Sequence, residues 1–257
     1  MADITPVEQI NNDVKQWEVE PLIVQTNTKS GKPVECVITP YLKKSSNALH
    51  IYNEQDGVQY DIPTEGDLNL VVNVNESGKV TPVGAMSIVV QEFVPTINMI
   101  QHVKAFEKID EGDAEPTTEG IMFGPTYEKT QHPAQSFMQG EDKVEWQKML
   151  LNEGEKLAKK HGFDRIRLMS GFSSRYLEGG YPLGLAVQQY DKLVNINSEW
   201  TPYNSKGVPI NDPEQRKLLN STVRKLRDGD LKTKQEVEKV LPVDLTPVYY
   251  QKDLNQR

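Results

Sequence analysis

The sequence predicts an α+β protein with a mixed, largely antiparallel sheet, a β-α-β core and a helical C-terminal appendage. Two observations predict this class. Three pairs of β-rich runs between residues 21 and 94 are separated by short turns that contain glycine, which is typical of hairpins. An amphipathic segment over residues 143–161 then leads through Gly162 into a β-rich run at 164–169, which is typical of a crossover helix.

The chain starts with a helix signal, and the hairpins follow. Thr5, Pro6 and Glu8 form a capping pattern that predicts a short amphipathic helix over residues 5–17. We expect three consecutive regions, namely an N-terminal helix with β-hairpins over 1–67, an α/β core over 68–204 and the helical appendage over 205–257.

The predicted appendage contains two helix signals. Asp212 and Gly229 bound the first helix, and Thr233 with Glu236 forms a capping box for the second. Residues 213–239 carry eight Lys/Arg against five Asp/Glu, which favours a solvated helix face; docking onto an acidic partner is the alternative. Because the helices at both ends are amphipathic, we expect their apolar faces to be covered by the body, by a protein partner or by a second copy in a homo-oligomer.

Composition excludes several classes of protein. The net charge of −8 disfavours a nucleic-acid binder, because phosphate contacts need clustered Lys and Arg. The single cysteine, Cys36, lies in a β-branched run and is predicted to be buried rather than nucleophilic. No metal-ligand spacing joins the four histidines, and neither a signal peptide nor a membrane span is seen, so we expect a cytoplasmic protein without a metal.

The middle of the chain holds the candidate ligand-binding segments. Residues 107–119 carry six acids and one lysine; a solvated loop is favoured over a metal or cationic-partner site. We expect residues 119–128 and 164–169 to be adjacent parallel strands joined through the 143–161 helix. The long connection before that helix is a candidate binding loop, and it offers His132 as a general base.

The order of these elements resembles the GNAT acetyltransferase superfamily over roughly residues 68–190. A hairpin at 69–90, a strand ending in "FGPTYEK", a helix, a strand and then "SSRYLEGGY" follow one another. Within the last stretch, Tyr176 lies four residues before Gly180, and Tyr181 takes the final aromatic place of the family's F-Y-x-x-x-G-F ending.

The resemblance implies an N-acyltransferase that uses acetyl-CoA, with direct attack of an amine on the thioester. Tyr176 would protonate the leaving thiolate as the general acid. By the same resemblance, the cofactor-binding residues would be Tyr127, Lys129, Gln139 and Gly140.

The chain departs from the family at the loop that holds the pyrophosphate. The family's Q/R-x-x-G-x-G/A loop is missing, and Gln139-Gly140 is followed by Glu141 and Asp142, whose carboxylates would repel phosphate. A non-catalytic structural or interaction protein, such as a subunit of a phage or other macromolecular assembly, is therefore the alternative. In that case Tyr176 would only pack its ring and hydrogen-bond a neighbour.

Overall fold

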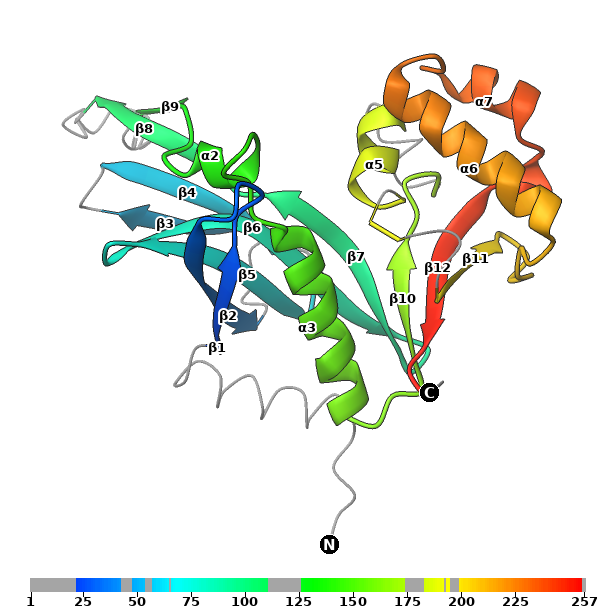
Figure 1. Ribbon diagram of the computed structural model, residues 1–257, viewed down its shortest axis with the longest axis horizontal. Coiled ribbons are helices and arrows are strands. Elements are labelled where there is room, and N and C mark those ends of the chain that lie inside the picture. The colour runs from blue at the N-terminus through cyan, green and yellow to red at the C-terminus, as the bar shows by residue number, and fades with distance from the viewer. Residues whose placement is uncertain are drawn as a thin grey trace, which may run out of the picture. The chain divides into compact units, whose positions relative to one another are not determined.

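The computed structural model describes residues 22–42, 48–53, 57–64, 66–110, 126–173, 183–191, 193–194 and 199–255 (Figure 1). The predicted helix over 5–17, most of the acidic segment 107–119, and Tyr176 lie outside these residues. The described residues form two compact units. We call residues 88–100 and 147–255 the C-terminal unit, and residues 22–87 and 101–146 the N-terminal unit. The units therefore divide the chain at positions other than the predicted boundaries at 67 and 204.

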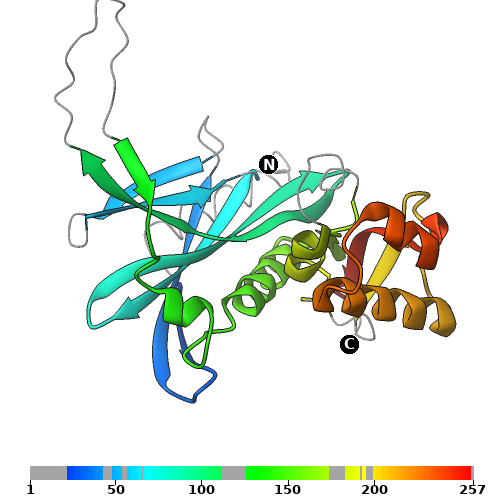
Figure 2. The same cartoon turned by 90° about the horizontal axis from the view of Figure 1, so that it is seen from above.

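The strands form two sheets, which confirms the α+β class with a mostly antiparallel arrangement. The larger sheet has eight strands in the order β1-β2-β5-β6-β7-β10-β12-β11, and the smaller has four in the order β3-β4-β8-β9. Figure 2 shows β8 and β9 lying side by side in the smaller sheet. The strand bounds are β1 Leu22–Asn27, β2 Pro33–Leu42, β3 Ala48–Asn53, β4 Val58–Pro63, β5 Leu68–Glu76, β6 Lys79–Gln91, β7 Val94–His102, β8 Lys104–Asp110, β9 Thr126–Lys129, β10 Arg165–Met169, β11 Trp200–Asn204 and β12 Pro247–Asp253.

The predicted hairpins are present because their turns contain residues that tolerate a positive φ. Gly31, in the turn between β1 and β2, has φ 88°, and the two strands then pair antiparallel from Leu22↔Ile38 to Asn27↔Pro33. Ser77 and Gly78, which join β5 to β6, have φ 55° and 89°. Successive positive φ values match the right-handed twist of the flanking strands, as in a type I′ turn.

The predicted pairing of residues 119–128 with 164–169 is wrong. The described part of the first segment belongs to β9, which pairs antiparallel with β8 in the smaller sheet. The parallel neighbour of β10 is instead β7, with Arg167 opposite Thr96 and Leu168 opposite Ile97. A β-α-β unit therefore exists, but residues 103–145 are inserted between its first strand and its helix α3 (Trp146–Lys160). Helix α3 also starts three residues later than predicted.

The C-terminal region contains the predicted helices, with their predicted caps. Helix α6 (Pro213–Asp228) is capped by Asp212, whose side chain accepts from the Gln215 N–H, and it ends at Gly229 with φ 83°. Helix α7 (Lys234–Val240) begins with the complete capping box of Thr233 and Glu236. On the apolar side of α6, Leu219 and Leu226 are buried, whereas Leu218 is 37% exposed. The remaining helical elements are α2 Gln135–Met138, α5 Leu183–Gln189 and the 3-10 turn η1 Val243–Leu245.

The region predicted as a helical appendage, residues 205–257, also contains a strand that the sequence did not predict. Strand β12 belongs to this region, and it lies between β10 and β11 in the larger sheet. Its central residues Val248, Tyr249 and Tyr250 are β-branched or aromatic, which favours a strand, and Tyr250 is fully buried. Among the described residues, no helix is long and apolar enough to cross a membrane.

Candidate functional site

Within the C-terminal unit, residues 94–100 of β7 run parallel to β10, and the two segments diverge beyond Ile97 and Leu168. Their register covers only Thr96↔Arg167 and Ile97↔Leu168, although β7 has nine residues and β10 has five. Figure 1 shows the strands meeting at one end and separating at the other, with both arrowheads at the open end. In open sheets, ligands bind beyond the carboxyl ends of parallel strands where neighbouring strands part. This end of the β7/β10 pair is therefore the candidate site.

A buried carboxylate holds the residues that follow β10 at this end. We call residues 170–173 the β10 turn. Asp191, just after α5, accepts hydrogen bonds from Ser170 Oγ (2.7 Å) and the Tyr250 hydroxyl at Oδ1 and from Gly171 N (2.9 Å) at Oδ2. The carboxylate thereby joins the β10 turn to strand β12 and to the end of α5.

The β10 turn is also packed tightly and has internal hydrogen bonds. A Cβ on Gly171 would lie 2.4–2.6 Å from backbone atoms of Ala186 and Val187 in α5, so only glycine leaves room for this contact. Ser170 Oγ accepts from the Phe172 N–H at 3.1 Å. Ser173 Oγ is buried and makes no hydrogen bond with the part of the chain that the structure describes. The turn thus has a fixed backbone and ends in a buried hydroxyl to which no described residue is hydrogen-bonded.

Burial changes the acidity of Asp191. Because the carboxyl is fully buried, desolvation raises its pKa to about 6, while the hydrogen bonds from Tyr250, Ser170 and Gly171 act in the opposite direction. Burial and the neighbouring Asp191 charge also raise the pKa of Tyr250 well above its ordinary value, so this hydroxyl keeps its proton. Asp191 is therefore the acceptor and Tyr250 the donor at neutral pH.

We expect Asp191 to make stability depend on pH. Since its folded pKa is raised from 3.8 to about 6, the folded state binds more protons than the unfolded state between these values. Its contribution is therefore fully present below about pH 4 and is lost as pH rises through about 6. Relative to Asp191→Asn, the wild-type free energy of unfolding should fall by about 3 kcal/mol across this window. Urea unfolding at several pH values measures it; parallel pH curves for the two proteins would contradict the assignment.

The start of α3 carries a different cluster, in the N-terminal unit. Trp146 is fully buried, and the His102 ring packs against it in an edge-on geometry, with 4.9 Å between the centroids. Desolvation and the nearby Lys143 charge lower the pKa of His102. Trp146 Nε1 has no hydrogen-bond partner among the described residues.

Two of the acids that precede α3, Glu141 and Asp142, are bonded to the β1–β2 turn. Lys29 Nζ lies 3.0 Å from Glu141 Oε1, and Ser30 Oγ donates to Asp142 Oδ1 at 2.8 Å. Glu141 and Asp142 thereby link the β1–β2 turn to the segment between α2 and α3. Gln139 and Gly140, predicted to bind the cofactor, are exposed residues at the end of α2.

The other predicted site residues do not meet in one described place. Tyr127 and Lys129 belong to β9 in the smaller sheet, and the Lys129 side chain is exposed. His132 is buried beside Tyr60, with 5.4 Å between the ring centroids, and its Nδ1 accepts from the Ala134 N–H. Those contacts give His132 a structural role in a turn. Tyr176 lies outside the described residues, so its role as general acid stays a prediction.

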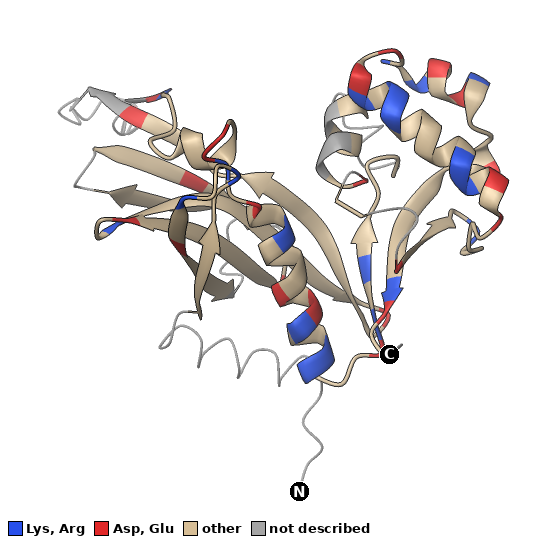
Figure 3. Cartoon of the chain, viewed as in Figure 1, with Lys and Arg blue, Asp and Glu red and all other residues tan. Residues whose placement is uncertain are grey.

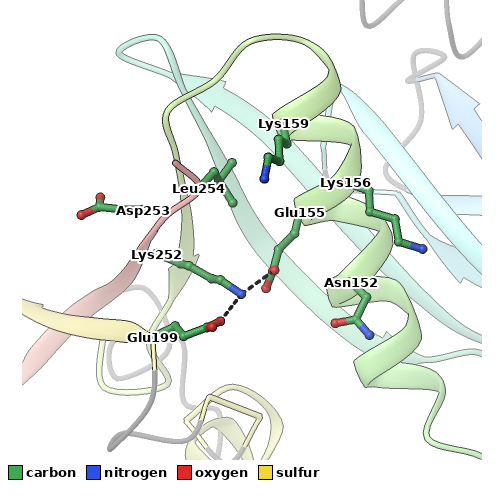
Figure 4. Close-up of a pocket in the computed structure, with 8 residues that line it drawn as sticks. All are labelled: Asn152, Glu155, Lys156, Lys159, Glu199, Lys252, Asp253 and Leu254. Carbon is green, nitrogen blue, oxygen red and sulfur yellow. Dashed lines mark hydrogen bonds and ion pairs between the residues drawn. The ribbon is translucent and has the colours of Figure 1, made fainter. Parts of the chain in front are cut away.

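The C-terminal unit also contains a polar groove with a volume of about 460 Å³ (Figure 4). Lys252 Nζ lies between Glu155 Oε2 (2.7 Å) and Glu199 Oε2 (2.5 Å). Burial opposes the charge of Lys252, but these carboxylates outweigh it and raise the pKa of the ammonium group. The lining residues are Asn152, Glu155, Lys156, Lys159, Glu199, Lys252, Asp253 and Leu254. Three lysines face three acids, so the groove presents no excess charge to a ligand.

The charged residues elsewhere are mostly paired across solvated helix faces. Figure 3 shows Lys and Arg interspersed with Asp and Glu on α6 and α7, where Lys217 pairs with Glu214 and Lys234 with Glu238. These pairs support the solvated-face interpretation of residues 213–239. In the described part of the chain, no group of three or more His, Cys, Asp or Glu side chains could hold a metal ion. Cys36 is fully buried, as predicted, and burial raises its pKa to about 11.

A search against protein-family models found no match for the chain, and a search of curated proteins found no match either.

Proposed function

We propose that the chain is an acyl-CoA-dependent N-acyltransferase, or a relative that keeps a GNAT-like core, acting in the cytoplasm. The observation that supports it is the diverging parallel pair β7 and β10, with helix α3 directly before β10 and the β10 turn directly after it. This is the strand, helix and strand order of the resemblance, with β7 in place of the strand that the sequence predicted.

The diverging strands suit the chemistry of coenzyme A. The pantetheine arm is extended and carries two amide groups, which can pair with a strand backbone as an added strand would. Residues 98–100 of β7 follow the last residue in register with β10, so they are the segment where such pairing would occur. An amine would attack the thioester carbonyl, the tetrahedral intermediate would expel the thiolate, and Tyr176 would donate the proton that yields the free thiol. The proton that the attacking nitrogen loses on forming the amide would return to the Tyr176 phenolate.

Calorimetric titration with acetyl-CoA tests this proposal. We expect binding in the micromolar range, and we expect pantetheine to compete for the same site, because the proposed contacts are to the arm. Binding of the adenosine 3′,5′-bisphosphate half alone would place the ligand elsewhere. No heat at millimolar acetyl-CoA would overturn the proposal.

Turnover can then be followed with a thiol-reactive dye. The reaction releases coenzyme A with a free thiol, while the single cysteine of the chain, Cys36, is fully buried and has a raised pKa. The protein itself should therefore react slowly with the dye, and the signal should depend on an added amine. Heat-denatured protein, in which Cys36 is exposed, provides the control for the background.

A non-catalytic structural or interaction protein is the second candidate. The observation that favours it is the pair Glu141 and Asp142, which lies in the connection to α3 where the superfamily would hold the pyrophosphate. This candidate predicts no acetyl-CoA binding together with stable self-association, which sedimentation velocity would measure.

A further inference from the structure

The β10 turn depends on Asp191 through two separate routes. One is direct, because the Gly171 N–H donates to Asp191 Oδ2 at 2.9 Å. The other passes through Ser170, whose hydroxyl donates to Asp191 Oδ1 and accepts from the Phe172 N–H. Consecutive backbone amides of the turn are therefore oriented by one carboxylate.

The carboxylate is more than a packing element for β12. Tyr250 donates to the same Oδ1 atom, so Asp191 has two hydroxyl donors on one oxygen, one from the β10 turn and one from β12. Of these two hydroxyls, the one of Ser170 also accepts from an N–H of the turn, that of Phe172. The two hydroxyls thus differ in their effect on the turn although they are matched in acceptor and burial.

The β10 turn ends in a hydroxyl group that could hydrogen-bond a ligand. Ser173 is 2% exposed, and its N–H donates to Ser170 O at 3.0 Å, which fixes its backbone. Its Oγ makes no hydrogen bond with the described residues. A buried hydroxyl of this kind at the carboxyl end of a parallel strand is a candidate hydrogen-bonding group for a bound molecule.

We propose that Asp191 is a positioning residue for acyl-CoA: it fixes the β10 turn so that the Ser173 hydroxyl hydrogen-bonds the ligand. This inference rests on the proposed acyl-CoA function. Ser173 would contact the ligand directly. Asp191 and Ser170 would affect ligand binding by holding the β10 turn, whereas Tyr250 would have no effect on ligand binding.

The test compares acetyl-CoA affinity in three variants of the full chain. Ser170→Ala and Tyr250→Phe each remove one hydroxyl donor from Asp191 Oδ1, but only Ser170→Ala frees the Phe172 N–H. We expect Ser170→Ala to weaken acetyl-CoA binding about 10-fold and Tyr250→Phe to leave it within about 2-fold. Ser173→Ala loses no described protein hydrogen bond, so it should weaken binding about 10-fold at an unchanged Tm.

Hydrogen exchange supplies a readout besides affinity. The Phe172 amide should exchange faster in Ser170→Ala than in Tyr250→Phe, at temperatures where both variants are folded. Should Ser170→Ala not fold, Ser173→Ala still decides the question, because its hydroxyl supports nothing else in the described structure.

The outcomes distinguish a failure of the proposed acyl-CoA function from a failure of the positioning role of Asp191. If wild-type protein binds no acetyl-CoA, the proposed function fails and this inference falls with it. If wild-type protein binds but Ser170→Ala and Tyr250→Phe weaken binding equally, or Ser173→Ala binds normally, the function stands and the positioning role is overturned.

Discussion

Replacing Asp191 with alanine is expected to lower the free energy of unfolding by about 4 kcal/mol. The side chain is 1% exposed, and it is the acceptor for the Ser170 hydroxyl, the Tyr250 hydroxyl and the Gly171 N–H. Removing it leaves three donors in a site that water does not reach, and each costs its desolvation energy. Chemical denaturation at pH 5, where the native carboxyl is largely protonated, measures the difference.

Two milder variants serve as controls for this prediction. Asp191→Asn keeps one oxygen for the hydroxyls but presents an NH₂ group to the Gly171 N–H, so its loss should be intermediate. Tyr250→Phe removes one donor and should cost about 1 kcal/mol. If Asp191→Ala were as stable as Tyr250→Phe, the Asp191 carboxylate would not be the centre of this cluster.

Placing a methyl group at Gly84 is expected to destabilise the protein by about 3 kcal/mol. A Cβ at this position would lie 2.2–2.7 Å from three ring atoms of Trp146. Trp146 is fully buried at the start of α3, so the ring has no open space to move into. The Gly84→Ala variant should therefore unfold at lower denaturant concentration with an unchanged m-value.

A double-mutant cycle isolates this contact. Trp146→Leu alone should be destabilising because it opens a cavity beside Gly84. On that background, Gly84→Ala should cost far less than in the wild type, since the methyl group then occupies part of the cavity. Additive costs in the double variant would show that the penalty at Gly84 comes from backbone conformation and not from the ring.

Local features of the fold could be predicted from the sequence because their causes are local. The Gly31 and Gly78 turns, the Asp212 cap and the Thr233 capping box each depend on a few consecutive residues, and the structure confirms them. The partner of β10 could not be predicted in this way. Both β7 and the segment that becomes β9 are β-rich and precede α3, and only tertiary packing decides which strand lies beside β10.

The cluster that supports the β10 turn was harder to predict than the fold. Ser170, Asp191 and Tyr250 are separated by 21 and 59 residues and form no motif, so nothing in the sequence connects them. A weak signal was present in the strand-Ser-Gly order after Met169, which marks a turn at a strand end. The strand that brings Tyr250 to this turn was itself assigned to a helical region, and the cluster was missed for that reason.

The place of β12 in the sheet also constrains the order in which the protein can fold. Strand β11 pairs with β12 and with no other named strand that the structure describes, and β12 in turn pairs with β10, across 84 residues from Arg167 to Gln251. Strand β11 can therefore join the sheet only together with β12 or after it. Until that pair arrives, β10 exposes an unpaired edge, which is where nascent or refolding chains associate with one another. Because long-range pairing is slow, refolding yield should fall with protein concentration before β12 docks.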